Sequence, residues 1–294
     1  MKKMIRPIIF GEVLFDCFPD GEQILGGAPF NVAWHLQAFG DQPCFVSRVG
    51  SDELGNKIIA AMEEWGMDTS FVQIDPQHRS GRVDVQLIED EPHYSIAPDC
   101  AYDFIDENEV CKPENKTILY HGTLGLRNAV ARHAFEMLAA NPKLSIFLDV
   151  NLRPPHWHKE DVSRWLQQAT WVKLNYDELE QLGSVTGDIQ HDMAQFQQRY
   201  QLEQLILTRG EKGAIVRTSK GELESIEPQQ VQKIVDTVGA GDAFTAVYLH
   251  GLISGWCLTD TLKMAQKFAS TVVGLRGATA NDPAFYKTIG LSHV

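Results

Sequence analysis

Apolar residues along the chain fall into short runs that alternate with longer amphipathic segments. The runs contain many β-branched and aromatic side chains, as expected of strands buried on both faces. They cover residues 7–11, 44–49, 117–120, 145–149, 170–174 and 204–208. Segment 52–66 shows the helical period, with Leu54, Ile58 and Met62 spaced by four. Strands that alternate with helices predict an α/β fold with a mostly parallel central sheet flanked by helices.

Two segments depart from this alternation. In 82–88 apolar and polar residues alternate, which indicates a half-buried strand, and a second short strand is expected at 93–97 after an acidic turn. Residues 12–25 have the pattern strand, turn, strand. We therefore expect a single domain, residues 1–294, with a small β lid built from about 12–25 and 80–104. A lid in this position excludes water from a reaction centre.

The composition is that of an ordinary globular protein, with 44% hydrophobic and 22% charged residues in a chain of 294. The formal net charge of -13 at pH 7 repels nucleic acid and anionic membranes, so we expect neither as a partner. A phosphate site needs only local positive potential and is not excluded. No stretch approaches the roughly 20 apolar residues that a membrane helix requires.

The cysteines give no sign of a disulfide framework. There are five, without a C-x-x-C pair, and an odd number in a long chain favours reduced thiols. The start Met1-Lys2-Lys3 is followed by a short, interrupted apolar run and no cleavage site of small residues, so a signal peptide is not expected. These features predict a cytoplasmic location.

The most informative segment is 236–244, which reads D-T-V-G-A-G-D-A-F. The apolar pair Ile234 and Val235 predicts a strand before it, and a helix follows. Glycines let backbone N–H groups approach an anion, and a helix N-terminus adds about half a positive charge. Asp242 in the first helical turn is either a helix cap or a general base for an alcohol nucleophile. Taken alone, the segment favours the cap, because neither the Walker A nor the dinucleotide motif is present.

A second glycine-containing segment, 26–33, reads G-G-A-P-F-N-V-A. Its proline suits the first position of a helix. Asn31 carries donors and acceptors that suit sugar hydroxyls, although a capping amide at a helix start explains it equally. Asp16 follows the first apolar run and is either a solvated loop residue or an acceptor for two vicinal hydroxyls.

Together these two segments resemble the two signatures of the ribokinase-like (PfkB) carbohydrate kinase family, and the resemblance covers essentially the whole chain. The sequence G-G-A-P-F-N-V-A-W-H-L is nearest to fructokinase-like members. Further family motifs occur in the same order. They are D-x-N-x-R at Asp149–Arg153, N-x-x-E at Asn175–Glu178, T-x-G-x-x-G at Thr208–Gly213, and the Gly-Ala pair Gly277–Ala278.

The resemblance implies roles at the reaction centre. Asp242 is implied as the general base, and the anion hole is implied to consist of the backbone amides of Gly239, Ala240 and Gly241. The residues implied to bind the sugar are Asp16, Gly27, Asn31 and Arg153.

The resemblance also implies a nucleotide site for ATP with Mg²⁺. The residues implied there are Asn175, Thr208, Gly210 and Gly277. Glu178 is implied to hold Mg²⁺ through water, and a hard cation held by waters and phosphates needs no protein cage. Many relatives bind a monovalent cation such as K⁺ near the loop that corresponds to Asp236 and Val238, and this sequence leaves that point open.

The implied activity is ATP-dependent phosphorylation of a monosaccharide hydroxyl, with fructokinase as the first expectation. Ketose-specific members carry an aromatic residue and an arginine in the lid, whereas 89–96 contains no arginine. Kinases of 2-keto-3-deoxygluconate, ribose or a nucleoside therefore remain alternatives. A non-catalytic sugar-binding regulator is the alternative from another class, and it would lack the base that Asp242 provides. Exposed lid edges suggest a homodimer, because an open strand edge invites pairing.

Overall fold

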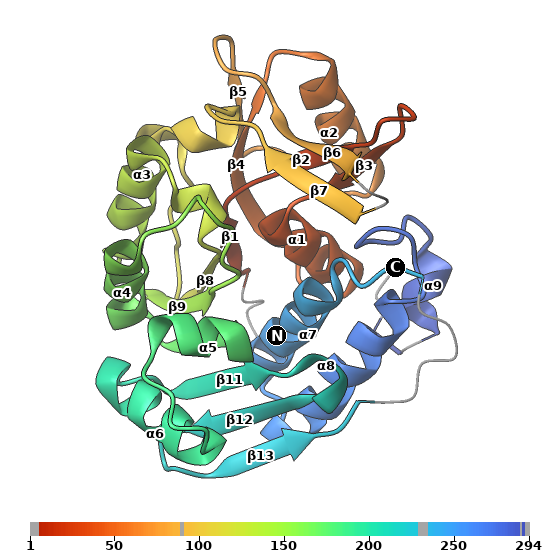
Figure 1. Ribbon diagram of the computed structural model, residues 1–294. Coiled ribbons are helices and arrows are strands. Elements are labelled where there is room, and N and C mark those ends of the chain that lie inside the picture. The colour runs from red at the N-terminus through yellow and green to blue at the C-terminus, as the bar shows by residue number, and fades with distance from the viewer. Residues whose placement is uncertain (1–5, 89–90, 229–234, 289, 292–294) are drawn as a thin grey trace.

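The computed structural model describes residues 6–88, 91–228, 235–288 and 290–291. Its centre is a nine-stranded sheet of order β13-β12-β11-β10-β9-β8-β1-β4-β5 (Figure 1). The strands are β1 (Ile8–Phe10), β4 (Cys44–Gly50), β5 (Val72–Asp75), β8 (Thr117–His121), β9 (Leu144–Asp149), β10 (Trp171–Asn175), β11 (Gln204–Thr208), β12 (Ala214–Thr218) and β13 (Leu223–Ile226). Neighbours from β11 to β5 pair in parallel, and β12 and β13 add antiparallel pairs. The expected mostly parallel α/β sheet is confirmed.

Helices cover both faces of this sheet (Figure 1). They are α1 (Ala28–Ala38), α2 (Glu53–Glu64), α3 (Ala129–Ala139), α4 (Lys159–Gln168), α5 (Tyr176–Leu182), α6 (Ile189–Tyr200), α7 (Ala240–Ser254), α8 (Leu258–Val272) and α9 (Pro283–Lys287). Side chains of β1 alternate between two cores. Ile9 packs in the cluster that contains residues of α1, α7 and α8, whereas Ile8 and Phe10 belong to the cluster of α3 and α4. Burial on both faces explains why the strands are nearly continuous apolar runs.

The predicted strands and helix are found where the patterns place them. The apolar runs form β1, β4, β8, β9, β10 and β11, and the segment 52–66 forms α2. The Asp52 side chain accepts a hydrogen bond from the Gly55 N–H at 2.8 Å and so caps α2. The strand expected at Ile234–Val235 is not observed: Ile234 lies outside the described residues, and Val235 is in a bend.

A second, four-stranded sheet has the order β3-β2-β6-β7 and lies beside α1 (Figure 1). Its strands are β2 (Leu14–Cys17), β3 (Gln23–Gly26), β6 (Gly81–Ile88) and β7 (Glu91–Ile96). β6 and β7 form an antiparallel hairpin, and the acidic turn expected at Glu89 and Asp90 lies outside the described residues. The segment expected to form the lid runs further, to 104. Its end, Ala101–Phe104, is a 3-10 turn that packs against β4 and α3 rather than in this sheet.

Within the described ranges, no helix is long and apolar enough to cross a membrane. The cysteines are all free. Four of them are buried, and Cys257 is exposed.

Candidate active site

A cavity of about 610 Å³ lies between the small sheet and the carboxyl ends of the central strands. Asp149, Asn175 and Thr208 end β9, β10 and β11, and all three line it. The small sheet contributes the opposite wall, which includes Asp16 and Tyr94. Ligands of open α/β sheets bind outside the carboxyl ends of the strands, so this is the expected place for a reaction centre.

Asp242 lines this cavity from the first turn of α7. Asn31, which is 3% exposed on α1, donates from Nδ2 to Asp242 Oδ2 at 2.8 Å. Burial raises the pKa of Asp242 to about 6, and the Asn31 hydrogen bond opposes that rise. A carboxyl group with a pKa about one unit below neutrality is ionised at pH 7 and is a stronger base than an ordinary aspartate. The Asp242 side chain does not cap the helix, since Gly239 is the N-cap residue and no side chain bonds there.

The loop before α7 is shaped by close backbone packing. Gly239 has φ +79°, and a Cβ at this position would lie 2.2 Å from Ala278 Cβ. The Asp236 carboxylate accepts from the Val238 N–H at 2.9 Å and from the Gly277 N–H at 3.3 Å. These contacts hold the N-terminus of the 15-residue helix α7 against the cavity. That terminus supplies positive potential for an anion, and the Ala240 N–H within it donates to the Thr237 carbonyl oxygen at 3.4 Å.

A buried ion pair lies beside the anion site. Lys173 Nζ donates to both carboxylate oxygens of Asp149, at 2.9 and 2.8 Å. Thr245 Oγ1 on α7 donates to Asp149 Oδ2 at 2.8 Å. Burial alone would lower the pKa of Lys173, but the Asp149 carboxylate outweighs it and the pKa is raised. A Cβ on Gly241 would lie 3.5 Å from Lys173 Nζ, so the ammonium group faces the start of α7.

Asn175 and Glu178 form a reciprocal cap at the start of α5. Asn175 Oδ1 accepts from the Glu178 N–H at 2.9 Å, and Glu178 Oε2 accepts from the Asn175 N–H at 2.8 Å. Glu178 Oε1 accepts from the Leu152 N–H at 2.8 Å. Both carboxylate oxygens thus hold backbone groups, and burial raises the Glu178 pKa.

The described residues contain no cluster of three His, Cys, Asp or Glu that fits a metal. The side-chain oxygens of Asn175 and Glu178 at the start of α5 suit a hard cation that keeps its water shell. Glu178 lines the cavity, so Mg²⁺ bound through water fits this site, whereas a direct protein cage does not.

The residues expected to bind the sugar, which are Asp16, Gly27, Asn31 and Arg153, all line this cavity. Burial raises the pKa of Asp16 to about 6, and the positive charge of Arg153 opposes that rise. Arg153 also lowers the pKa of Asp242, so its positive charge acts on carboxylates at both ends. A Cβ on Gly27 would lie 2.8 Å from the Glu12 carbonyl oxygen, which explains a glycine here.

Three of the expected site residues do not line this cavity. Ala240 lies in the first turn of α7, between two lining glycines. Gly210 begins a 3-10 turn, Gly210–Lys212, and the Gly277 N–H points to Asp236. The structure thus brings together the catalytic and sugar-end residues, with Asn175, Glu178 and Thr208.

Two buried charged side chains, Glu12 and Lys173, are among the lining residues that the sequence analysis does not predict. Glu12 is 3% exposed, its Oε2 has no hydrogen-bond partner, and burial raises its pKa to about 7. The sequence analysis places Lys173 only within the apolar run 170–174. Its position within W-V-K-L-N was the available signal, because a lysine at the centre of a buried strand requires a charged partner.

Comparison with known proteins gives the class. The family described as pfkB family carbohydrate kinase matches residues 16–284. The protein therefore belongs to the pfkB family of carbohydrate kinases, and the expected kinase class is confirmed.

Curated relatives and solved structures similar to this chain include kinases of several sugars. A fructokinase of Salmonella typhimurium is 27% identical, over 94% of this chain and 95% of the relative. A 5-dehydro-2-deoxygluconokinase of Clostridium beijerinckii is 24% identical, over 89% and 82%. The crystal structure of fructokinase from Vibrio cholerae O395 in fructose, ADP and calcium ion bound form has a TM-score of 0.86 at 26% identity, over 97% of this chain and 99% of that chain. The expected ribokinase-like fold is confirmed.

Proposed function

We propose that the protein is a fructokinase that transfers the γ-phosphoryl group of ATP to a hydroxyl of fructose. The observation that carries the proposal is the Asp242 carboxylate, held by Asn31 at the N-terminus of α7 inside the cavity. The fructokinase relatives support the choice of sugar.

In the proposed mechanism Asp242 accepts the proton of the attacking hydroxyl. Phosphoryl transfer requires mainly positioning and stabilisation of charge. The amides of Gly239, Ala240 and Gly241 stabilise charge that develops on the transferred group, and α7 adds its positive end. Lys173, although paired with Asp149, faces the same helix start and adds a fixed positive group.

We assign the sugar to Asp16, Gly27 and Arg153, in the part of the cavity covered by the small sheet. Asp16 accepts from sugar hydroxyls, and the missing Cβ of Gly27 leaves room beside the backbone. Asn31 acts on Asp242 and is a positioning residue in this scheme. The small sheet serves as the lid, which excludes water from the transferring phosphoryl group.

We assign the ATP site to Asn175, Thr208, Gly210 and Gly277. Glu178 would hold Mg²⁺ through water, and the ion would supply positive charge for the phosphates. K⁺ is proposed at the loop of Asp236. The hydrogen bond from the Gly277 N–H to the Asp236 carboxylate supports this, because it shapes the loop next to the proposed phosphate site.

The test is ADP release with Mg-ATP and K⁺ over a panel of fructose, ribose, glucose, 2-keto-3-deoxygluconate and adenosine. A dominant response to fructose is expected. A response confined to another sugar would replace the substrate and keep the mechanism. Silence over the whole panel from folded protein would favour a non-catalytic sugar-binding regulator.

One observation favours a second candidate substrate. The described part of the β7 segment, 91–96, carries no arginine and offers Tyr94 to the cavity. The 5-dehydro-2-deoxygluconokinase relative makes a deoxy-keto sugar acid the second candidate, with Arg153 as the cation for its carboxylate. Addition of that sugar to the panel separates the two.

We also infer a homodimer that forms through the small sheet. β7 is an edge strand, and Tyr94 on it is 55% exposed. An open edge with an exposed aromatic residue is suited to pairing with a second copy. Sedimentation as a monomer at micromolar concentration would contradict the dimer.

A cytoplasmic location is part of the proposal and is supported by the free cysteines. Cell fractionation with an antibody to the protein tests it. Recovery outside the cytoplasmic fraction would contradict it.

A further inference from the structure

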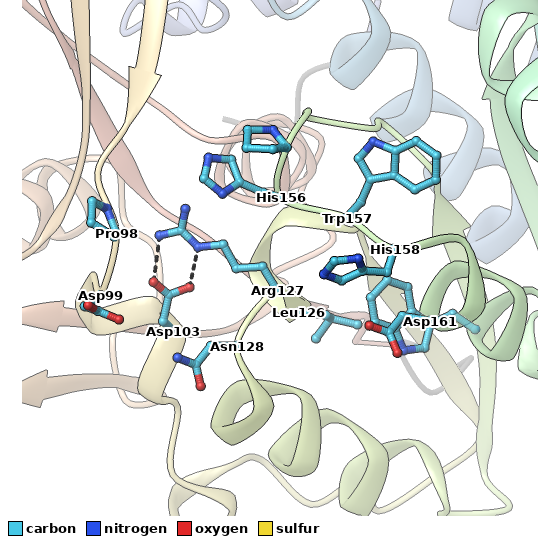
Figure 2. A pocket seen from close by; sticks show the side chains of 12 residues that line it. Pro98, Asp99, Asp103, Leu126, Arg127, Asn128, His156, Trp157, His158 and Asp161 are labelled. Atoms are coloured by element: carbon cyan, nitrogen blue, oxygen red, sulfur yellow. Dashed lines mark hydrogen bonds and ion pairs between the residues drawn. The ribbon is translucent and has the colours of Figure 1, made fainter.

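A second cavity, of about 280 Å³, lies next to the proposed active site. Figure 2 shows the side chains that line it. Its lining residues include Asp99, Asp103, Arg127, His156, Trp157 and Trp165. None of them lines the active-site cavity.

The two cavities share their walls. Ile96 lines the active-site cavity, and Pro98 and Asp99 line the second one. Likewise, Leu124 lines the active-site cavity and Leu126 lines the second cavity. In the loop after β9, Arg153 faces the active-site cavity and residues 155–158 face the second. Three separate chain segments, 96–99, 124–126 and 153–158, therefore contact both cavities.

Arg127 provides the main polar group of the second cavity. Its Nε and Nη2 donate to the two Asp103 oxygens at 2.8 and 2.7 Å, and Nη2 also donates to the Ala97 carbonyl at 2.7 Å. The Arg127 side chain is only 9% exposed, and Nη1 has no hydrogen-bond partner. Figure 2 shows Nη1 directed away from Asp103, toward the half-buried His156 ring. A buried guanidinium group with an unused donor indicates a missing acceptor.

Two helices begin at this cavity. Asn128 is the N-cap residue of the 11-residue helix α3, and His158 is the N-cap residue of the 10-residue helix α4. No side chain caps α4. The first turn of α4 carries Glu160 and Asp161, and the Asp161 carboxylate pairs with both Arg132 and Arg164. The Asn128 side chain caps α3 by accepting from the Val130 N–H at 2.9 Å, so the uncapped N-terminus of α4 is the one that favours an anion in this cavity.

We propose that this second cavity binds the phosphate group of a small phosphate monoester, such as a sugar phosphate. The phosphate accepts from Arg127 Nη1 and His156, after the His156 ring turns aside, and from N–H groups at the start of α4. Side-chain rearrangements of this size are common on binding. Planar guanidinium groups match phosphate geometry well.

The rest of the cavity fits the organic part of the ester. Trp157 and Trp165 give it aromatic walls, and Asp99 at the rim accepts from hydroxyl groups. Free phosphate would leave these groups unused. Because the loop of Arg153 forms part of both cavities, an ester bound here contacts the chain that holds the proposed sugar site.

The test is calorimetric titration of the full chain with fructose 6-phosphate, fructose and inorganic phosphate. Binding is measured without turnover, so the result does not depend on the proposed function. The cavity variants are Arg127→Lys, which keeps a charge for Asp103, and His156→Ala. The control variants are His191→Ala, which removes an exposed histidine on α6, and Arg153→Ala, which alters the active-site cavity.

We expect the ester to bind to the wild type and to both controls, and each cavity variant to weaken binding about tenfold, as expected for a lost charge-assisted hydrogen bond. Unchanged binding in His156→Ala and Arg127→Lys would overturn the proposal. Loss of binding in Arg153→Ala alone would assign the ester to the active site and also overturn it. If inorganic phosphate bound as tightly as fructose 6-phosphate, the aromatic walls would add nothing to the affinity for the ester, and the monoester site would be rejected.

Discussion

The Asn31 amide donates to the Asp242 carboxylate at 2.8 Å, across a separation of 211 residues in the sequence. This bond joins the start of α1, which follows the small sheet, to the start of α7, which follows the anion loop. It orients the proposed base, and it stabilises the ionised form that accepts a proton.

Asp242→Asn should remove the base without changing the shape of the cavity. We expect turnover to fall about 10²- to 10⁴-fold, the usual contribution of a general base. ATP affinity should stay within about twofold, because the helix N-terminus is unchanged. Steady-state kinetics and nucleotide titration measure both. Near-normal turnover would eliminate Asp242 as the base.

Asn31→Ala should change the pH dependence of turnover. The Asn31 hydrogen bond lowers the pKa of Asp242, which is about 6, so its removal raises that pKa. The acid limb of the rate profile should move to higher pH, and activity at pH 6.5 should fall more than activity at pH 8.5. A pH–rate profile of both proteins checks this. Equal losses at the two pH values would point to a structural defect instead.

Glu12→Gln should stabilise the protein at high pH. The pKa of Glu12 rises from 4.5 in the unfolded chain to about 7 in the fold, because burial disfavours the charge. The folded state therefore binds the proton more tightly, and the wild-type free energy of unfolding falls as pH rises from 4.5 to 7. We expect a gain of about 2 kcal/mol at pH 8 and almost none below pH 4. Urea unfolding at the two pH values measures the difference, and a gain that is the same at both would refute this explanation.

Lys173→Met should destabilise the fold, because it leaves the Asp149 carboxylate buried without its ion partner. Loss of one member of a buried pair costs about 3–5 kcal/mol. The double variant Lys173→Met with Asp149→Asn should recover part of this loss. Urea unfolding of the wild type and the variants gives the comparison. A double variant less stable than the single one would argue against an uncompensated charge as the cause.

Gly239→Ala should distort the anion loop, since the new Cβ would lie 2.2 Å from Ala278 Cβ. Gly255→Ala is the matched control: its φ of +73° is similar, and nothing lies within 4 Å of its Cβ position. We expect the control to lose about 1 kcal/mol of stability with normal kcat. Gly239→Ala should lose kcat at least tenfold. Equal kcat in the two variants would remove the loop from the mechanism.

Much of the fold follows from local patterns. β1, β8 and β9 are apolar on both faces, and α2 has a clear period with an Asp52 cap. β13 was missed because its residues alternate between exposed and half-buried and its sequence, L-E-S-I, is short. Its place depends on pairing with β12, which a local pattern does not contain.

The candidate site was predictable where a motif carried it, as for Asp242 and Asn31. The partners of these groups were not, because they arise from chain segments far apart. Glu12 and Lys173 show this, since only the fold reveals which groups lie next to them. The Gly277 N–H donates to Asp236, a contact that the Gly-Ala motif does not predict.

The connection between the small sheet and α1 has a consequence for the timing of the reaction. β3 ends at Gly26 and α1 begins at Ala28, so a single residue, Gly27, separates the sheet from the helix that holds Asn31. Because Gly27 alone separates them, a movement of the small sheet would also move the start of α1 and the Asn31 side chain that donates to Asp242. We therefore expect coverage of the cavity by the small sheet and orientation of the proposed base to be coupled.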